Sequence, residues 1–200
     1  DRRQRQMCIR DRLNSPQGQE EARQANNHST AHDAQVIAFA MYAGNMKVAR
    51  EVINAIPRKR LFTQIEPDGK QPHELRRTLA FGYSQFNLSH FIDIFMMARK
   101  IGISIDNATS EDGRSFYKAM DFLVPYVGKD VKAWPYQQIS EWKYKQQEFC
   151  KDLYRTFLLN PERKDYLKLY KTHRIIDWKD RFNLLWMEAD DCLLYTSPSP

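Results

Sequence analysis

The stretch TAHDAQVIAFAMYAGNMKVAREVINAIP, residues 30–57, decides the fold. Its first half carries apolar residues at helical spacing, and Gly44 and Asn45 mark a stop. These residues are Ala34, Ile37, Ala38, Met41 and Tyr42. The same spacing returns in its second half, and Pro57 is expected to end that helix. The apolar residues there are Val48, Val52, Ile53 and Ile56. Two amphipathic helices joined by so short a turn predict an antiparallel pair.

Further helices follow this pair along the chain. Residues 62–70 read as a loop, because Glu66-Pro67-Asp68-Gly69 is a turn sequence. Pro72 suits the first turn of a helix continuing to about residue 85. The apolar stretch 88–100 predicts a largely buried helix closed by Gly102. The two are either separate or one long helix bent near Asn87.

The remainder of the chain continues the helical pattern. Ser110-Glu111-Asp112 is expected to cap a helix that runs to Val127. Residues 133–145 are aromatic and irregular, and residues 148–160 and 162–171 predict helices on either side of Pro161. The predicted class is therefore all-α, built of antiparallel helix pairs. Periodicity alone leaves a bundle, a solenoid and an α/α toroid open.

Both ends of the chain differ in character from its body. Residues 1–11 and 192–200 resemble translated sequencing-adapter DNA, so we interpret them as scars and expect both natural ends to be missing. Cys150 is then the only native cysteine, and no internal disulfide is expected.

Charge and hydropathy limit the possible partners. The net charge of +6 falls to +4 without residues 1–11, so the basic signal for nucleic acid is weak, and no nucleic-acid partner is expected. No apolar run approaches the roughly 18 residues that a membrane span needs, so membrane insertion is not expected either.

One polar motif, Asn26-Asn27-His28-Ser29-Thr30, stands where the chain enters the first helix. Two amides, an imidazole and free helix N–H groups at one helix start can meet an anion. Ordinary helix capping accounts for the same residues. The motif alone therefore leaves a site and a cap open.

A second motif, Gln71-Pro72-His73-Glu74-Leu75-Arg76-Arg77-Thr78, leads on to Tyr83, Ser84 and Asn87. On one continuous helix Arg76 shares a face with Tyr83, whereas Arg77 points elsewhere. Salt bridges from the arginines to Glu74 or Asp68, with Tyr83 in the core, are the alternative reading.

Together, the two motifs and Gln64-Ile65-Glu66-Pro67-Asp68-Gly69 between them resemble the alginate lyase family of polysaccharide lyases, over residues 25–127. The resemblance implies an incomplete (α/α) toroid, with residues 12–191 as the C-terminal part of the helical domain. It also implies β-elimination of an acidic polysaccharide, alginate or a glucuronan-like polyuronate, without a cofactor, in the periplasm or outside the cell. Since family members are longer toward the N-terminus, the fragment itself is expected to be impaired.

The resemblance also assigns roles to particular side chains. Asn27 and Arg77 are expected to neutralise the substrate carboxylate. Two proton-transfer schemes stay open: Tyr83 serves as both base and acid, or His28 is the base and Tyr83 the acid. A tyrosine base needs nearby positive charge, because its pKa is normally about 10. Four residues are expected to help bind substrate: Asn26, Arg76, Gln71 and Trp134.

Two other readings compete with catalysis by these side chains. His28 and His32 lie four apart beside Asp33, as zinc ligands can, but no convincing third ligand follows, so no metal is expected. A non-catalytic carbohydrate-binding module on the same scaffold is the rival function. It would not require Asn27, His28, Arg77 and Tyr83 together. The oligomeric state cannot be inferred from the sequence.

Overall fold

The computed structural model describes residues 13–175 and 179–186. The two segments interpreted as adapter-derived lie outside these residues. Within them the chain forms helices, turns and two isolated β-bridges, with no strand. The all-α prediction is therefore confirmed. None of the described helices combines the length and apolar character that crossing a bilayer requires.

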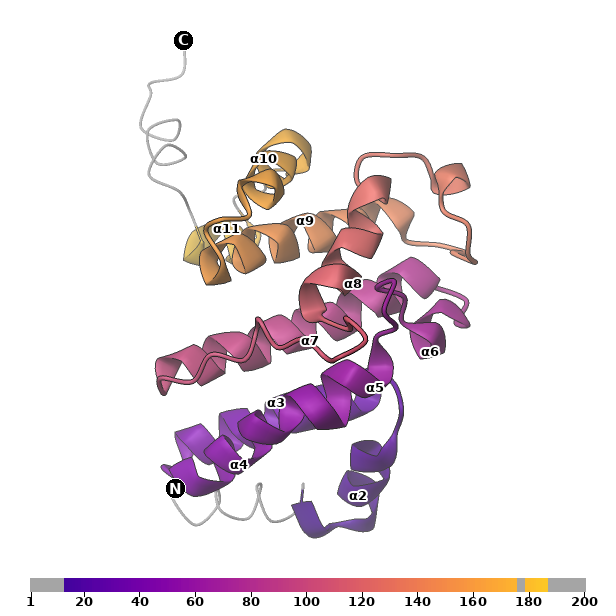
Figure 1. Ribbon diagram of the computed structural model, residues 1–200. Coiled ribbons are helices and arrows are strands. Elements are labelled where there is room, and N and C mark those ends of the chain that lie inside the picture. The colour runs from indigo at the N-terminus through magenta and orange to yellow at the C-terminus, as the bar shows by residue number, and fades with distance from the viewer. Residues whose placement is uncertain (1–12, 176–178, 187–200) are drawn as a thin grey trace, which may run out of the picture.

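The helices follow one another with short connections (Figure 1). In chain order they are α2 (Pro16–Arg23), α3 (Asn27–Tyr42), α4 (Met46–Ile56), the π-helix η1 (Pro57–Leu61), α5 (Phe62–Gln64), α6 (Pro72–Leu75), α7 (Ala80–Lys100), α8 (Phe116–Leu123), the 3₁₀ turns η2 (Val124–Tyr126) and η3 (Val131–Ala133), α9 (Trp142–Leu159), α10 (Lys164–His173) and α11 (Arg181–Leu185).

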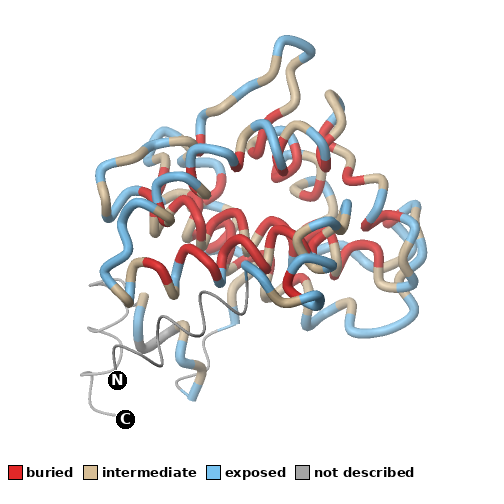
Figure 2. Tube along the Cα trace, turned by 90° about the horizontal axis from the view of Figure 1, so that it is seen from below, coloured by how far each residue is buried: buried red, intermediate tan, exposed pale blue. Residues whose placement is uncertain are grey.

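Helix α7 is the centre of the packing. It contacts α3 on one side and α9 on the other, while α4 and α10 pack outside these two. Buried residues gather in the interior of the helix assembly, whereas much of the loop backbone is exposed (Figure 2). The largest fully buried side chains are mostly aromatic: Tyr166, Phe81, Phe91, Phe95, Phe116 and Phe149. Burying such rings is the main stabilising contribution to the core that these helices share.

The antiparallel pair predicted over residues 30–57 is present. Asn26 caps α3, with its Oδ1 accepting from the His28 N–H, and Gly44 adopts a left-handed φ of +74° after the helix. Helix α4 ends at Ile56 with Pro57 as its C-cap, as predicted, but the chain does not enter a turn there. Because proline has no N–H to donate, the chain widens into the π-helix η1 and continues into α5.

The helix predicted over residues 72–85 is interrupted, which corrects the sequence expectation. The chain leaves helical geometry from Arg76 to Leu79 and re-enters it at Ala80. The cause is a partner distant in sequence: the Ala80 N–H donates to the Gln137 carbonyl, and the Ile139 N–H donates to the Thr78 carbonyl. Helix α7 then continues without a break through Asn87, where the bend was expected.

Two helix starts also differ from the prediction. Helix α8 is capped by Ser115 rather than Ser110, whose hydroxyl instead accepts from the Arg114 N–H in a turn. Helix α9 begins at Trp142, inside the segment expected to be irregular. The residue before it, Glu141, has a φ of +60°, a left-handed conformation uncommon for a residue with a side chain.

Candidate functional site

A cleft of about 490 Å³ opens beside the first turn of α3. It is enclosed by α2, α3, the non-helical segment 76–79 and α7, and its lining residues are Gln17, Glu21, Asn27, His28, Ala31, His32, Gln35, Arg77, Tyr83 and Phe86. The N-terminus of a helix carries partial positive charge and free N–H groups. The location therefore favours an anionic ligand.

Asn27 is held in place by Glu74. One carboxylate oxygen accepts from the Asn27 backbone N–H at 2.6 Å, and the other accepts from its side-chain Nδ2 at 2.8 Å. Glu74 is almost fully buried, and burial raises its pKa above the ordinary value although the bonds from Asn27 offset part of the increase. The contact joins α6 to the start of α3 and leaves the second N–H of the amide for a ligand.

His28 lies at the rim of the cleft and is paired with α2. Its Nδ1 is 2.9 Å from Oε2 of Glu21, and both side chains are nearly half exposed. A carboxylate at Nδ1 favours the tautomer that carries the proton there. The opposite nitrogen, Nε2, is then a base that a ligand in the cleft can reach.

Arg77 lies over the ring of Tyr83. The guanidinium carbon is 4.0 Å from the ring centroid, a cation–π contact. The break between α6 and α7 produces this contact, because it turns Arg77 toward the cleft and leaves Arg76 exposed. The two residues that the motif placed on different helix faces are therefore neighbours.

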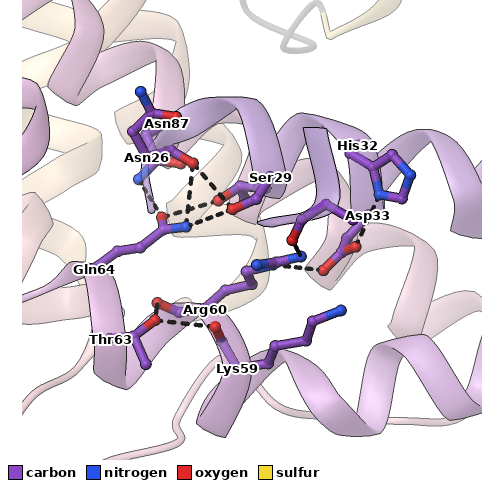
Figure 3. A network of polar contacts seen from close by, with 11 residues as sticks. Asn26, Ser29, His32, Asp33, Lys59, Arg60, Thr63, Gln64 and Asn87 are labelled. Atoms are coloured by element: carbon purple, nitrogen blue, oxygen red, sulfur yellow. Dashed lines mark hydrogen bonds and ion pairs between the residues drawn. The ribbon is translucent and has the colours of Figure 1, made fainter. Parts of the chain in front are cut away.

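A buried network of amides supports the cleft from behind. Asn87 donates to Oε1 of Gln64, and the Gln64 amide donates to Ser29 (Figure 3). Thr30 also donates to Oε1 of Gln64. Asn87 also donates to Gln71. Since the members come from α3, α5 and α7, these bonds fix the start of α3 relative to the helix that carries Tyr83.

A buried ion pair lies further along α3. Nε of Arg60 donates to Oδ2 of Asp33 at 2.7 Å, and Nδ1 of His32 is 3.2 Å from the other oxygen. Burial alone would raise the pKa of Asp33, but the bonds from His32 and Arg60 lower it below the ordinary value. The guanidinium group of Arg60 also donates a hydrogen bond from Nη2 to the Ala22 carbonyl, which connects this pair to the end of α2.

The structure brings the four predicted catalytic side chains to one cleft, but not the four predicted substrate-binding residues. Asn26 caps α3, and the Arg76 side chain is exposed outside the lining. Gln71 is buried and bonded to Ser84 and Asn87. Trp134 is 5% exposed among aromatic rings, including Phe81 at 5.3 Å, so its position is that of a core residue.

Three residues that line or support the cleft were not singled out from the sequence. Glu74 was considered only as a partner for the arginines, although it stands inside the second motif. Glu21 belongs to a polar helix with no distinguishing pattern. Phe86, three residues after Tyr83, is an exposed aromatic residue in an apolar helix, and that exposure is visible only in the fold.

The described residues offer no cluster of three or more histidine, cysteine, aspartate or glutamate side chains that could hold a metal ion. His32, considered as a zinc ligand, instead contacts Asp33. Cys150 is buried in the core, and burial raises its pKa to about 12, so it has no role as a thiolate at neutral pH.

Comparisons with known proteins place the chain beside alginate lyases. The family model described as Alginate lyase matches residues 7–134. The crystal structure of an alginate lyase from Bacteroides ovatus is similar with a TM-score of 0.89 and 44% sequence identity, over 94% of this chain and 49% of that one. This chain thus spans about half the length of that protein, and the likeness confirms the predicted all-α toroid class. No curated protein matches.

Proposed function

The chain belongs to the alginate lyase family, and we propose that the protein cleaves alginate or a related polyuronate by β-elimination. The observation that carries the proposal is the convergence of Asn27, His28, Arg77 and Tyr83 on one cleft. Capping or surface ion pairing would account for each of these residues singly, but neither requires all four to face the same space.

The chemistry demands stabilisation of negative charge. The C5 proton of a uronate is weakly acidic, and its removal adds charge beside a carboxylate that is already ionised. Groups that are held in advance around that carboxylate lower the barrier without having to reorganise. The Asn27 amide, fixed by Glu74, and the Arg77 guanidinium have this role in our proposal.

Proton transfer requires a base for C5 and an acid for the O4 leaving group. His28 offers Nε2 as the base when the sugar presents its proton toward α3, and Tyr83 then donates to the leaving oxygen. For the opposite stereochemistry at C5, Tyr83 serves both steps. Arg77, over the Tyr83 ring, stabilises the phenolate that the second scheme needs.

The test uses the intact protein that contains this chain. Polymannuronate, polyguluronate and glucuronan are each supplied, and the ultraviolet absorbance of the unsaturated uronate product is followed. We expect one of them to be cleaved at a rate that Tyr83→Phe and Asn27→Ala each reduce by about 100-fold or more. If His28→Gln is equally inactive, His28 is the base; if it retains activity, Tyr83 serves both steps.

A folded protein that cleaves none of the three polymers would contradict the proposal. Binding of a uronate polymer without cleavage would favour the carbohydrate-binding alternative. Because such polymers are too large to cross the inner membrane freely, the proposal includes a periplasmic or extracellular location. The cleft needs no cofactor for this chemistry.

A further inference from the structure

A second cavity adjoins the cleft on the far side of Tyr83. It has a volume of about 210 Å³ and is lined by Leu79, Gly82, Tyr83, Phe86, Glu141 and Lys145. Tyr83 and Phe86 line both spaces, so their rings separate the second cavity from the cleft. A polymer bound across Tyr83 can therefore place its next sugar in this cavity.

Lys145 reaches the cavity by lying across Gly82. A Cβ atom at Gly82 would be 3.1–3.3 Å from Cγ, Cδ and Cε of Lys145, which is closer than ordinary packing. The missing side chain of Gly82 thus lets the lysine stem lie against α7, and its ammonium group is carried to the neighbourhood of Tyr83. The Lys145 side chain is 21% exposed, so its charge is only partly screened by water.

The backbone at Glu141 sets the position of this lysine. Its left-handed φ of +60° begins α9, and the Lys145 N–H donates to the Glu141 carbonyl in the first turn. Strained backbone of this kind is often found at functional sites. Nζ of Lys145 forms an ion pair with the Glu141 carboxylate at 4.0 Å and lies 5.1 Å from the Tyr144 ring centroid. Since 4.0 Å is beyond hydrogen-bond distance, a ligand carboxylate can still accept from its N–H groups, in competition with Glu141.

We propose that the second cavity is a subsite for the uronate beyond the two sugars at the cleaved bond, and that Lys145 binds the carboxylate of that uronate. The inference rests on the proposed function. Each sugar of a polyuronate carries one carboxylate, and a lysine in the cavity that shares Tyr83 with the cleft suits the next carboxylate in line. Lys145 is then a specificity residue that acts on substrate length.

The test compares a uronate disaccharide with the tetrasaccharide in the intact protein. Lys145→Met removes the charge but keeps the stem, and Lys143→Met is the matched control, because Lys143 is exposed on the same helix and lies outside both cavities. We expect Lys145→Met to raise KM for the tetrasaccharide roughly fivefold and to weaken its salt dependence. Its KM for the disaccharide and both values of kcat should stay within about twofold of wild type.

Gly82→Ala provides a second variant, since the added methyl group would push the lysine stem away from α7 by a few tenths of an ångström. It should raise KM for the tetrasaccharide as well and add little when combined with Lys145→Met. Equal KM values for Lys145→Met and Lys143→Met on the tetrasaccharide, in a wild-type background that is active, would overturn the subsite alone. A folded wild-type protein inactive on both substrates would instead overturn the proposed function, and the subsite with it.

Discussion

The carboxylate of Glu74 binds Asn27 with both oxygens, at 2.6 Å to the backbone nitrogen and 2.8 Å to Nδ2. The two residues are 47 positions apart, and each is nearly inaccessible to solvent. One acidic side chain therefore fixes both the start of α3 and the direction of the amide that faces the cleft. The pair connects the stability of the fold to the geometry of the proposed site.

Replacement of Glu74 by glutamine should lower both the stability of the fold and the activity of the proposed site. Glutamine has one acceptor oxygen instead of two and presents its NH₂ group to a donor of Asn27, which leaves a buried group unsatisfied. We expect the free energy of unfolding to fall by about 1–3 kcal/mol and kcat to fall with it. Urea denaturation and initial rates measure the two effects. Glu111→Gln, an exposed site with the same chemical change, should alter neither, and equal stability of the two variants would contradict the structural role.

The two consecutive arginines should differ sharply in function. Arg77 contacts the Tyr83 ring in the cleft, while Arg76 is exposed outside it. Arg77→Gln should lower kcat by about 10²–10³-fold, the usual loss when a group that stabilises developing charge is removed. Arg76→Gln, with the same loss of charge, should remain within about twofold of wild type. Initial rates on the preferred polymer measure both values of kcat. A larger loss for Arg76→Gln than for Arg77→Gln would place Arg76 at the substrate.

How far the sequence predicts this structure depends on the range of the interactions. The pair α3 and α4 was predictable because its apolar spacing and its Gly44-Asn45 stop are local. The break between α6 and α7 was not, because its cause is hydrogen bonding to residues 137–139, about 60 positions away. An ideal helix continued through that break selects Arg76 instead of Arg77 as the neighbour of Tyr83.

The site shows the same division. The resemblance to the alginate lyase family led to Asn27, His28, Arg77 and Tyr83, which line one cleft. Their supporting residues were harder to find, because Glu74 and Glu21 are defined by their partners and not by a pattern. Gln71 belongs to the resembling motif for a structural reason, since its side chain bonds Asn87 inside the protein.

Stability should depend on pH through Asp152. This carboxylate is buried, accepts from the Gln85 amide at 2.7 Å and lies near Arg155; burial raises its pKa from 3.8 to about 6. Because the pKa of Asp152 is higher in the folded state than in the unfolded chain, the protonated carboxyl group stabilises the fold. This contribution is fully present below pH 4 and is lost as the pH rises to about 6. Asp152→Asn should remove this loss, worth ~3 kcal/mol.

Denaturation of the wild type and of Asp152→Asn from pH 4 to pH 7 tests the assignment. The stability difference between the two proteins should change across this range in favour of the variant as the pH rises. Asp68→Asn serves as the control, because the exposed Asp68 has a pKa that its bond with Lys70 lowers. Parallel curves for wild type and Asp152→Asn would show that Asp152 titrates normally.

Two aromatic residues should separate substrate binding from core stability. Trp134 is buried, with the rings of Phe81 and Tyr126 at 5.3 and 4.7 Å, so Trp134→Ala should cost about 3–5 kcal/mol in unfolding free energy. Its KM, measured well below the unfolding transition, should not change. Phe86 is 42% exposed between the two cavities, so Phe86→Ala should change stability by only about 0.5 kcal/mol but raise KM roughly fivefold. A raised KM for Trp134→Ala with unchanged stability would instead support the substrate-binding role expected for Trp134 from the sequence.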